Sequence, residues 1–273
     1  MKRMILKYFS GTGNSMRIMD ICNAYFKKED CNSIMSSITE TENDDYSSAD
    51  SIGFVFPVYA FGLPRICTQF LKSLPNTKDG QKAFLLVTAG ALDESGFALK
   101  NGRNILGKKG YDVTYTDVIE MPSNWTTFDN PPPKDLADTI LEKGEKQALE
   151  IASNIANDRT SHHRFNIPKR MGYSRLLFEY VSFHYFGIHQ MWRMFRVSSS
   201  CNACGTCEKV CPTGSVVLVD ETPCWNSSCE QCMRCVNFCP KQAIFQTHGG
   251  ETKGKNRYHE PHFKPQKATK LLH

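Results

Sequence analysis

The sequence has no long run of uncharged apolar residues. A helix needs about 18 such residues in succession to span a membrane, and the 273 residues contain no such stretch. The first segment, Met1 to Phe9, leads into a glycine-containing loop and not into a signal-peptide cleavage site. We therefore predict a cytoplasmic protein without a membrane span.

Cysteine is almost absent from the first 200 residues. Only Cys22, Cys31 and Cys67 fall there, whereas nine of the twelve cysteines lie between Cys201 and Cys239. Secreted domains stabilised by disulfides spread their cysteines along the chain, and a reducing cytosol leaves thiols free. The clustering therefore excludes a dispersed disulfide framework and indicates metal ligation.

A broad excess of charge is also missing. The net charge of +5 arises in one segment, residues 159–197, which holds seven basic residues and one acidic residue. This distribution argues against a nucleic-acid partner. No Ser-His-Asp order, paired-carboxylate motif or His-Glu-x-x-His motif is present, so the sequence assigns no catalytic residue.

The clustered cysteines repeat one pattern. Cys201 to Pro212 reads CNACGTCEKVCP and Cys229 to Pro240 reads CEQCMRCVNFCP, so each run is Cys-x-x-Cys-x-x-Cys-x-x-x-Cys-Pro. Three thiolates in a tight loop can hold three corners of an iron-sulfur cube, and in two-cluster arrangements the fourth ligand comes from the other run. The predicted ligands are Cys201, Cys204, Cys207 and Cys239 for one 4Fe-4S cluster, and Cys229, Cys232, Cys235 and Cys211 for the other.

Residues 198–247 resemble bacterial two-cluster ferredoxins in this pattern. The resemblance implies a pseudo-twofold fold of short hairpins and helices, and the segments GSVVLV and KQAIFQ after the two runs read as matching strands. Zinc ribbons fit poorly, because each site would need two Cys-x-x-Cys pairs. We expect the leftover Cys224 to be a small buried hydrophobic residue and not a ninth ligand.

The N-terminal part begins with a strand, a polar glycine loop and a helix. The apolar segment Met4 to Phe9 runs into Ser10-Gly11-Thr12-Gly13-Asn14-Ser15, after which apolar residues recur at helical spacing. Backbone N–H groups and short hydroxyls in front of a helix N-terminus suit a phosphate. The loop matches neither the dinucleotide nor the P-loop fingerprint.

Strands and helices alternate through residues 1–158. Further strands are predicted at residues 32–38, 51–56, 83–88 and 111–119, and further helices at 63–73, 94–107 and 134–157. This alternation predicts an α/β fold with a doubly wound parallel sheet, whose ligands bind beyond the carboxyl ends of the strands. Two loops at those ends complete the candidate site: Pro57, Val58, Tyr59, Ala60, Phe61 and Gly62, and Thr88, Ala89 and Gly90.

The phosphate loop is similar to the Ser/Thr-x-Thr-Gly-x-Ser/Thr motif of flavodoxins. That resemblance implies a five-stranded sheet of order 2-1-3-4-5 and an FMN cofactor. Ser10 to Ser15 would hold the ribityl phosphate, Tyr59 to Phe61 would flank the isoalloxazine, and Ala89 with Gly90 would lie along its polar edge. The alternative is a structural anion site without flavin.

The chain as a whole looks like the flavodoxin-ferredoxin fusion family of anaerobic bacteria. We expect four parts: an FMN domain (1–158), a helical connector (159–197), a ferredoxin module (198–247) and a tail (248–273). The tail either wraps back over a domain or is disordered at the surface.

The connector combines basic residues with one apolar helical face, formed by Leu177, Tyr180, Val181, His184, Ile188, Met191 and Phe195. This face predicts a helix packed on the FMN domain; a helix that docks on a membrane surface or a partner is the alternative. A histidine on such a face is more often satisfied by packing than catalytic.

A two-electron carrier beside two one-electron carriers can split or merge electron pairs. The sequence therefore predicts an electron-transfer flavo-iron-sulfur protein with a redox protein partner. Two alternatives remain: a terminal reductase of a small organic acceptor, and a membrane-surface redox adaptor docking through residues 159–197. A homodimer also remains open.

Overall fold

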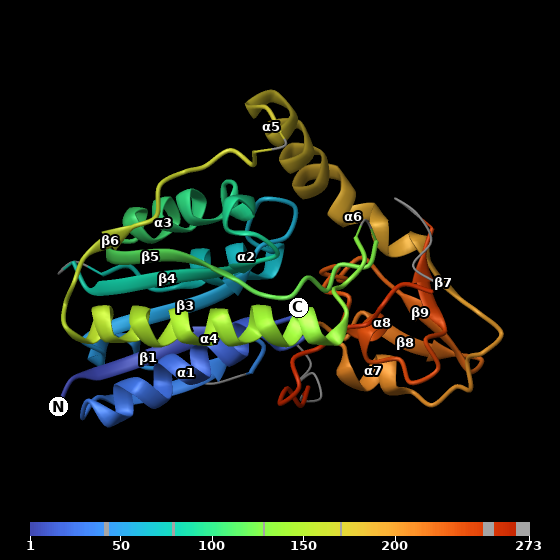
Figure 1. Ribbon diagram of the computed structural model, residues 1–273, viewed down its shortest axis with the longest axis horizontal. Helices are drawn as coiled ribbons and strands as arrows, with labels where there is room; N and C mark the ends of the chain where they lie inside the picture. The colour runs from blue at the N-terminus through green and yellow to red at the C-terminus, as the bar shows by residue number, and fades with distance from the viewer. Residues whose placement is uncertain (41–43, 78–79, 128, 170, 248–253, 266–273) are drawn as a thin grey trace.

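The computed structural model describes residues 1–40, 44–77, 80–127, 129–169, 171–247 and 254–265. An α/β unit and a small cysteine-rich module lie side by side, and a helical connector runs from one to the other (Figure 1). Among the described residues, no helix is both long and apolar enough to cross a membrane.

The α/β unit is built on a parallel sheet of order β2-β1-β3-β4-β5-β6. The predicted order 2-1-3-4-5 is confirmed, but the predicted number of five strands is one short. The sixth strand is only two residues long and both are exposed, so no apolar pattern marks it. The strands are β1 Arg3–Tyr8, β2 Asn32–Ser37, β3 Ser51–Pro57, β4 Lys82–Ala89, β5 Asp112–Glu120 and β6 Ser161–His162.

Helices cover both faces of this sheet. The helices α1 (Asn14–Lys28) and α4 (Lys134–Ala156) lie on one face, and α2 (Arg65–Ser73) and α3 (Ala98–Lys108) on the other (Figure 1). Because side chains alternate along a strand, β3 can fill both cores. Phe54 and Phe56 pack toward α2 and α3, and Val55 packs toward α1 and α4.

The connector helix changes its winding halfway. The α-helix α5 (Tyr173–Val181) continues into a π-helical turn (Ser182–Gly187), a short α6 (Ile188–Gln190) and a 3-10 turn (Met191–Met194). A π turn has more residues than an α turn, so it rotates the next part of the helix about its axis. The predicted apolar face is only partly right: Ile188, Met191 and Phe195 are buried, but Leu176 and Phe183 are buried instead of Leu177 and His184. Leu176 and Leu177 precede the π turn, so the turn does not explain the difference between these two.

The cysteine-rich module consists of two short two-stranded sheets and two short helices. Here β7 (Phe195–Val197) pairs with β10 (Ile244–Gln246), and β8 (Val216–Val219) pairs with β9 (Thr222–Trp225). The segments GSVVLV and KQAIFQ thus both contain a strand, although each pairs with a different partner. The expectation that Cys224 is buried was wrong, because this residue of β9 is exposed and pairs with the exposed Val217 of β8. The expectation that it is not a ninth ligand stays a prediction.

The C-terminal segment 254–265 returns to the α/β unit. The Glu260 amide donates to the Thr12 carbonyl at 2.8 Å, and the Tyr258 hydroxyl donates to Asn14 Oδ1 at 3.0 Å. Of the two alternatives for the tail, this part therefore wraps back, over the predicted phosphate loop. Residues 248–253 and 266–273 lie outside the described residues.

Candidate functional site

The eight predicted cluster ligands line two separate cavities. One, which we name the distal cavity, is lined by Cys201, Cys204, Cys207 and Cys239. The other, the proximal cavity, is lined by Cys211, Cys229, Cys232 and Cys235. The fold thus brings together the same two sets of four that the crossing pattern predicts, with one cysteine of each set supplied by the other run.

Local backbone geometry forms these cavities. The helices α7 (Thr206–Val210) and α8 (Arg234–Asn237) each come after a residue in the left-handed region, Gly205 with φ of 71° and Met233 with φ of 56°. Such a residue reverses the chain sharply before the helix begins. The three closely spaced cysteines of each run therefore curve around one point.

Donor groups point at the sulfur atoms in both cavities. The Ala243 amide donates to Cys239 Sγ at 3.3 Å, and Gln231 Nε2 donates to Cys229 Sγ at 3.4 Å. The Thr206 hydroxyl lies 3.3 Å from Cys204 Sγ, and the Ser215 hydroxyl 3.3 Å from Cys211 Sγ. Such bonds stabilise thiolates and tune the potential of a bound iron-sulfur cluster.

A single metal ion and a cubane cluster require different spacings of their thiolates. Thiolates around one tetrahedral zinc ion stand about 3.8 Å apart, given a Zn–S distance of about 2.3 Å. In the part of the chain that the structure describes, no three His, Cys, Asp or Glu side chains are placed to hold one metal ion. Four cysteines around a cavity fit a larger inorganic group, whose corners stand further apart.

Burial and hydrogen bonding shift the pKa values of cysteines in both cavities. In the proximal cavity, burial raises the pKa of Cys232 to about 11 and raises the pKa values of Cys229 and Cys235 as well. In the distal cavity, the hydrogen bond from Thr206 lowers the pKa of the exposed Cys204. Burial also raises the pKa of the distal Cys207 to about 11, so the two cavities differ in the exposure of Cys204 and not at every cysteine.

The proximal cavity touches the predicted phosphate loop. A Cβ atom at Gly11 would stand 2.7 Å from the Cys232 carbonyl oxygen and 2.8 Å from the Tyr59 hydroxyl. Only glycine allows this approach. The Tyr59 hydroxyl is buried and has no hydrogen-bond partner in the described chain, which leaves one polar group available between the loop and the cysteines.

Arg234 joins the two units. Its guanidinium is buried and donates to the carbonyl oxygens of Ser10 at 2.5 Å, Gly11 at 2.7 Å and Val210 at 2.9 Å. It also lies 5.2 Å from the centre of the Phe263 ring. Burial lowers its pKa. A buried cation among neutral carbonyls is stable only with an anion nearby, and a thiolate-bound cluster in the proximal cavity would supply one.

A second contact fixes the proximal loop from the other side. Glu230 is almost fully buried, and its carboxylate accepts from Arg65 Nε at 2.8 Å and from the Ile66 amide at 3.2 Å. Ile66 lies in the first turn of α2, where a carboxylate interacts favourably with the helix dipole. The proximal cysteines are thus held against both the phosphate loop and α2.

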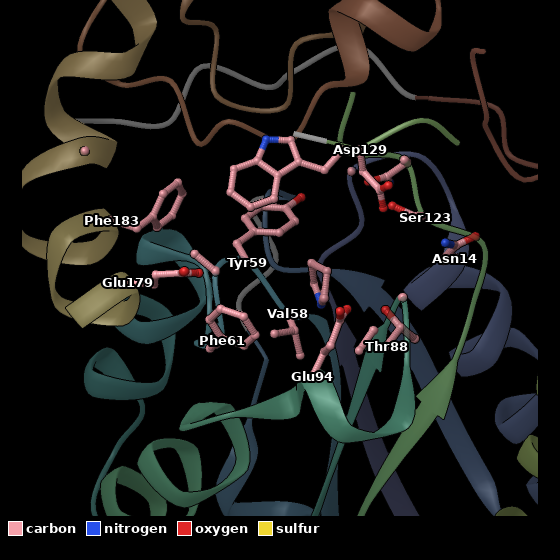
Figure 2. Close-up of a pocket in the computed structure, with 18 of the residues that line it drawn as sticks. Asn14, Val58, Tyr59, Phe61, Thr88, Glu94, Ser123, Asp129, Glu179 and Phe183 are labelled. Carbon is pink, nitrogen blue, oxygen red and sulfur yellow. The ribbon is translucent and has the colours of Figure 1, made fainter. Parts of the chain in front are cut away.

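A cavity of about 1020 Å³ opens at the carboxyl ends of β1, β3 and β4. Of the fifteen residues that the sequence predicts there, twelve line it: Ser10, Gly11, Asn14, Ser15, Pro57, Val58, Tyr59, Ala60, Phe61, Thr88, Ala89 and Gly90. Figure 2 shows Asn14 and Thr88 on one side of this cavity and Tyr59 and Phe61 toward the other.

The remaining three predicted residues lie behind the cavity wall. Thr12 and Gly13 are covered by the tail, since Glu260 and Phe263 pack on Gly13. Gly62 closes a tight turn with Tyr59 and is covered by the connector. These residues shape the loops without facing the cavity.

The phosphate end of the cavity has the features of an anion site. The helix α1 begins at Asn14, the Ser10 hydroxyl accepts from the Gly13 amide at 2.9 Å, and the hydroxyls of Ser15 and Thr88 lie 2.8 Å apart. Short hydroxyls and backbone amides at a helix N-terminus suit a phosphate. With the aromatic loop at Tyr59 and Phe61, the cavity can take a ligand that has one anionic end and one flat end.

Two further segments line the cavity that the sequence did not identify. One comes after β5 and includes Met121 to Trp125, and the other is the connector, from Arg175 to Met194. The first could have been found from its place after a strand end. The second had no such signal, because it folds back from a distant part of the chain; Figure 2 shows its Glu179 and Phe183 facing the cavity.

Comparison with known proteins gives one family match and several structural likenesses. Residues 196–217 match the family model described as a 4Fe-4S binding domain. No curated protein matches the chain. Among solved structures, a flavodoxin from the domain Archaea is 15% identical with a TM-score of 0.40, covering 56% of this chain and 98% of that one.

Two other solved structures show similar values. A flavodoxin from Megasphaera elsdenii is 22% identical with a TM-score of 0.38 and covers 53% of this chain and 98% of its own. Rubredoxin oxygen:oxidoreductase from Desulfovibrio gigas is 15% identical with a TM-score of 0.39, and the match covers 57% of this chain and 36% of that one.

Proposed function

We propose that this chain is an electron-transfer flavo-iron-sulfur protein. Residues 1–158 would bind FMN, residues 198–247 would hold two 4Fe-4S clusters, and residues 159–197 would connect them. Of the tail 248–273, the described part 254–265 would close over the phosphate loop. The flavin supplies a carrier of one or two electrons, and each cluster carries one. The protein's residues bind and orient these groups.

One observation carries this proposal: the proximal cavity adjoins the predicted phosphate loop. Cys232, Gly11 and Tyr59 meet at contact distance, and Arg234 donates to the loop from the cysteine-rich module. A cluster in the proximal cavity would therefore lie next to a flavin in the large cavity. The distal cavity includes the exposed Cys204, so an external one-electron carrier would exchange electrons there.

Cofactor analysis of anaerobically purified protein tests this proposal. We expect about eight irons, about eight sulfides and about one FMN per chain, because two cubane clusters and one flavin site require them. Redox titration followed by EPR should show two cluster signals. Eight irons without flavin, even after FMN is offered, would contradict the flavin half of the proposal, and a content of zinc without sulfide would contradict the other half.

The extent of the cavity favours a second candidate function, a terminal reductase. Beyond the loops that would hold FMN, the cavity of about 1020 Å³ is also lined by the connector, from Arg175 to Met194. Glu179 lines the connector side of the cavity, whereas Glu94 and Asp129 line the parts formed by the loops after β4 and β5. A small organic acceptor could then take electrons from the flavin. Turnover of such an acceptor with a reduced one-electron donor protein distinguishes this function from pure electron transfer.

A further inference from the structure

The large cavity has two ends of different chemistry. The first, which we name the cofactor end, is formed by the predicted loops around Ser10, Tyr59 and Thr88. The second, the connector end, is formed by Trp125 and by connector residues from Arg175 to Met194. In Figure 2, Phe183 and Glu179 lie on the side away from Asn14 and Thr88. The connector end therefore offers space beyond the loops that would hold FMN.

Aromatic and methionine side chains form much of the connector end. The rings of Trp125 and Phe183 meet edge to face with their centroids 5.4 Å apart, and Phe183 is buried. The other apolar side chains of this end are Phe178, Met191 and Met194. Aromatic rings and methionines make large contacts with flat conjugated molecules.

Carboxylates outnumber cations among the described charged residues of this cavity. Glu94, Asp129 and Glu179 line it together with one guanidinium, that of Arg175, which binds Glu179 at 2.8 Å. Glu94 lies beside Gly90, and Figure 2 shows Asp129 on the side of Ser123 and Asn14. The described charged residues of the connector end are therefore only the paired Arg175 and Glu179. Because its cation is already paired, this end suits an uncharged ligand better than an anion, whose charge would have to be desolvated.

The connector is fixed in place by its other contacts. His184 Nε2 donates to the Tyr59 carbonyl at 2.9 Å, and Asn101 donates to the Tyr180 hydroxyl at 2.7 Å. The π turn Ser182–Gly187 contributes Ser182, Phe183 and Gly187 to the cavity wall. A π turn costs regular hydrogen bonding and is frequent at functional sites. The connector end is thus a preformed wall.

We propose that the connector end binds a small, flat, uncharged conjugated carbonyl compound of the quinone type as the terminal electron acceptor. This inference rests on the proposed function, because the electrons must reach the acceptor through the clusters and the flavin. The step is balanced: a one-electron donor protein supplies two electrons in succession, water supplies two protons, and both C=O groups of the quinone become C–OH groups.

A pair of quinones that differ in charge tests this proposal on the holoprotein. Oxidised, FMN-loaded protein is titrated with 2-methyl-1,4-naphthoquinone and with anionic 1,4-naphthoquinone-2-sulfonate, and binding is followed by the change in the visible flavin spectrum. We expect the uncharged quinone to bind at least about 10-fold more tightly, because the sulfonate would have to lose water at an end whose only described cation is already paired with Glu179. Equal affinities would overturn the proposal.

Two phenylalanines of the connector provide a matched control. Phe178 and Phe186 are both 69% exposed, but only Phe178 lines the cavity. Phe178→Ala should weaken binding of the uncharged quinone about 10-fold, because an aromatic contact is lost, and Phe186→Ala should leave it unchanged. Ser182→Trp should fill the connector end and abolish quinone binding. Unchanged binding in Ser182→Trp would also overturn the proposal.

The same samples separate this inference from the proposed function. Iron, sulfide and FMN are quantified in each, and reduction of the flavin through the clusters is measured without quinone. Normal cofactors and normal flavin reduction without quinone binding refute only the acceptor site. Absence of bound FMN refutes the proposed function, and the acceptor site falls with it.

Discussion

The two cysteine cavities come from one repeated pattern but lie in different surroundings. The proximal cavity is walled by the stacked rings of Phe195 and Trp225 and held by Arg234 and Glu230 against the α/β unit. The distal cavity contains an exposed cysteine, Cys204, and is bordered by Lys241. The comparison teaches that ligand spacing sets which group binds, whereas the surroundings set what the group does.

The largest effect should come from removing one ligand of each cavity. Cys232→Ala and Cys204→Ala should each lower the iron content from about eight to about four, because each removes one cluster. They should differ in their effect on the flavin. Loss of the adjacent proximal cluster should make the EPR signal of a flavin radical saturate at lower microwave power, and loss of the distal cluster should not. Identical saturation in both variants would break the comparison.

A buried and an exposed cation provide the next test. Arg234→Met removes three hydrogen bonds and the charge that faces the proximal cavity, so we expect the free energy of unfolding to fall by about 3 kcal/mol. Lys209→Met, an exposed residue of α7 in the distal run, should change it by less than about 0.5 kcal/mol. Anaerobic urea titration of the holoprotein measures both. Equal losses would show that the two cavities are supported alike.

Features that depend on residues close together in the sequence could be predicted, and features that depend on distant residues could not. The β3 strand alternates Phe54 and Phe56 with Val55, and the cysteine spacing brings three thiols around one point; both are local patterns, so strands and cysteine sets could be predicted. The bounds differ by a few residues; α3, for instance, begins at Ala98. The π turn could not be predicted, because helical periodicity assumes a constant number of residues per turn.

Contacts between distant segments were beyond the sequence signals. Arg234 reaches Ser10 and Gly11 across more than 220 positions, and nothing in either segment encodes the other. Likewise the connector's Phe183 lines the same cavity as the strand-end loops, and the tail's Tyr258 bonds to Asn14 of that cavity. The sequence therefore indicated the cofactor end of the site but not the connector end.

A hydrogen bond of the tail gives a smaller effect. Tyr258→Phe removes the bond to Asn14 Oδ1 at the start of α1. The loss of about 1 kcal/mol should raise the FMN dissociation constant about 5-fold, because Asn14 borders the phosphate end. The distal counterpart, Thr206→Val, removes the hydroxyl beside Cys204 and should leave FMN affinity unchanged. Fluorescence titration with FMN compares them, and a larger effect for Thr206→Val would contradict our view of which cavity adjoins the flavin.

The smallest effect concerns the pH dependence of stability, through His184 of the connector, which bonds to the Tyr59 loop. Burial lowers the pKa of His184, although its bond to the Tyr59 carbonyl acts in the opposite direction. In the unfolded chain its pKa is about 6.5, so the unfolded state binds the proton more readily. The stability that neutral His184 contributes is therefore fully present above about pH 6.5 and is lost as the pH falls below it.

The measurement is the urea midpoint of the holoprotein at pH 7.5 and at pH 5.5. Wild type should lose stability between these values, and His184→Gln should lose less, because no buried imidazole must be charged. His189→Gln, at an exposed histidine of the same segment, should keep the wild-type difference. If His184→Gln behaved like wild type, the contact between connector and Tyr59 loop would not depend on the imidazole.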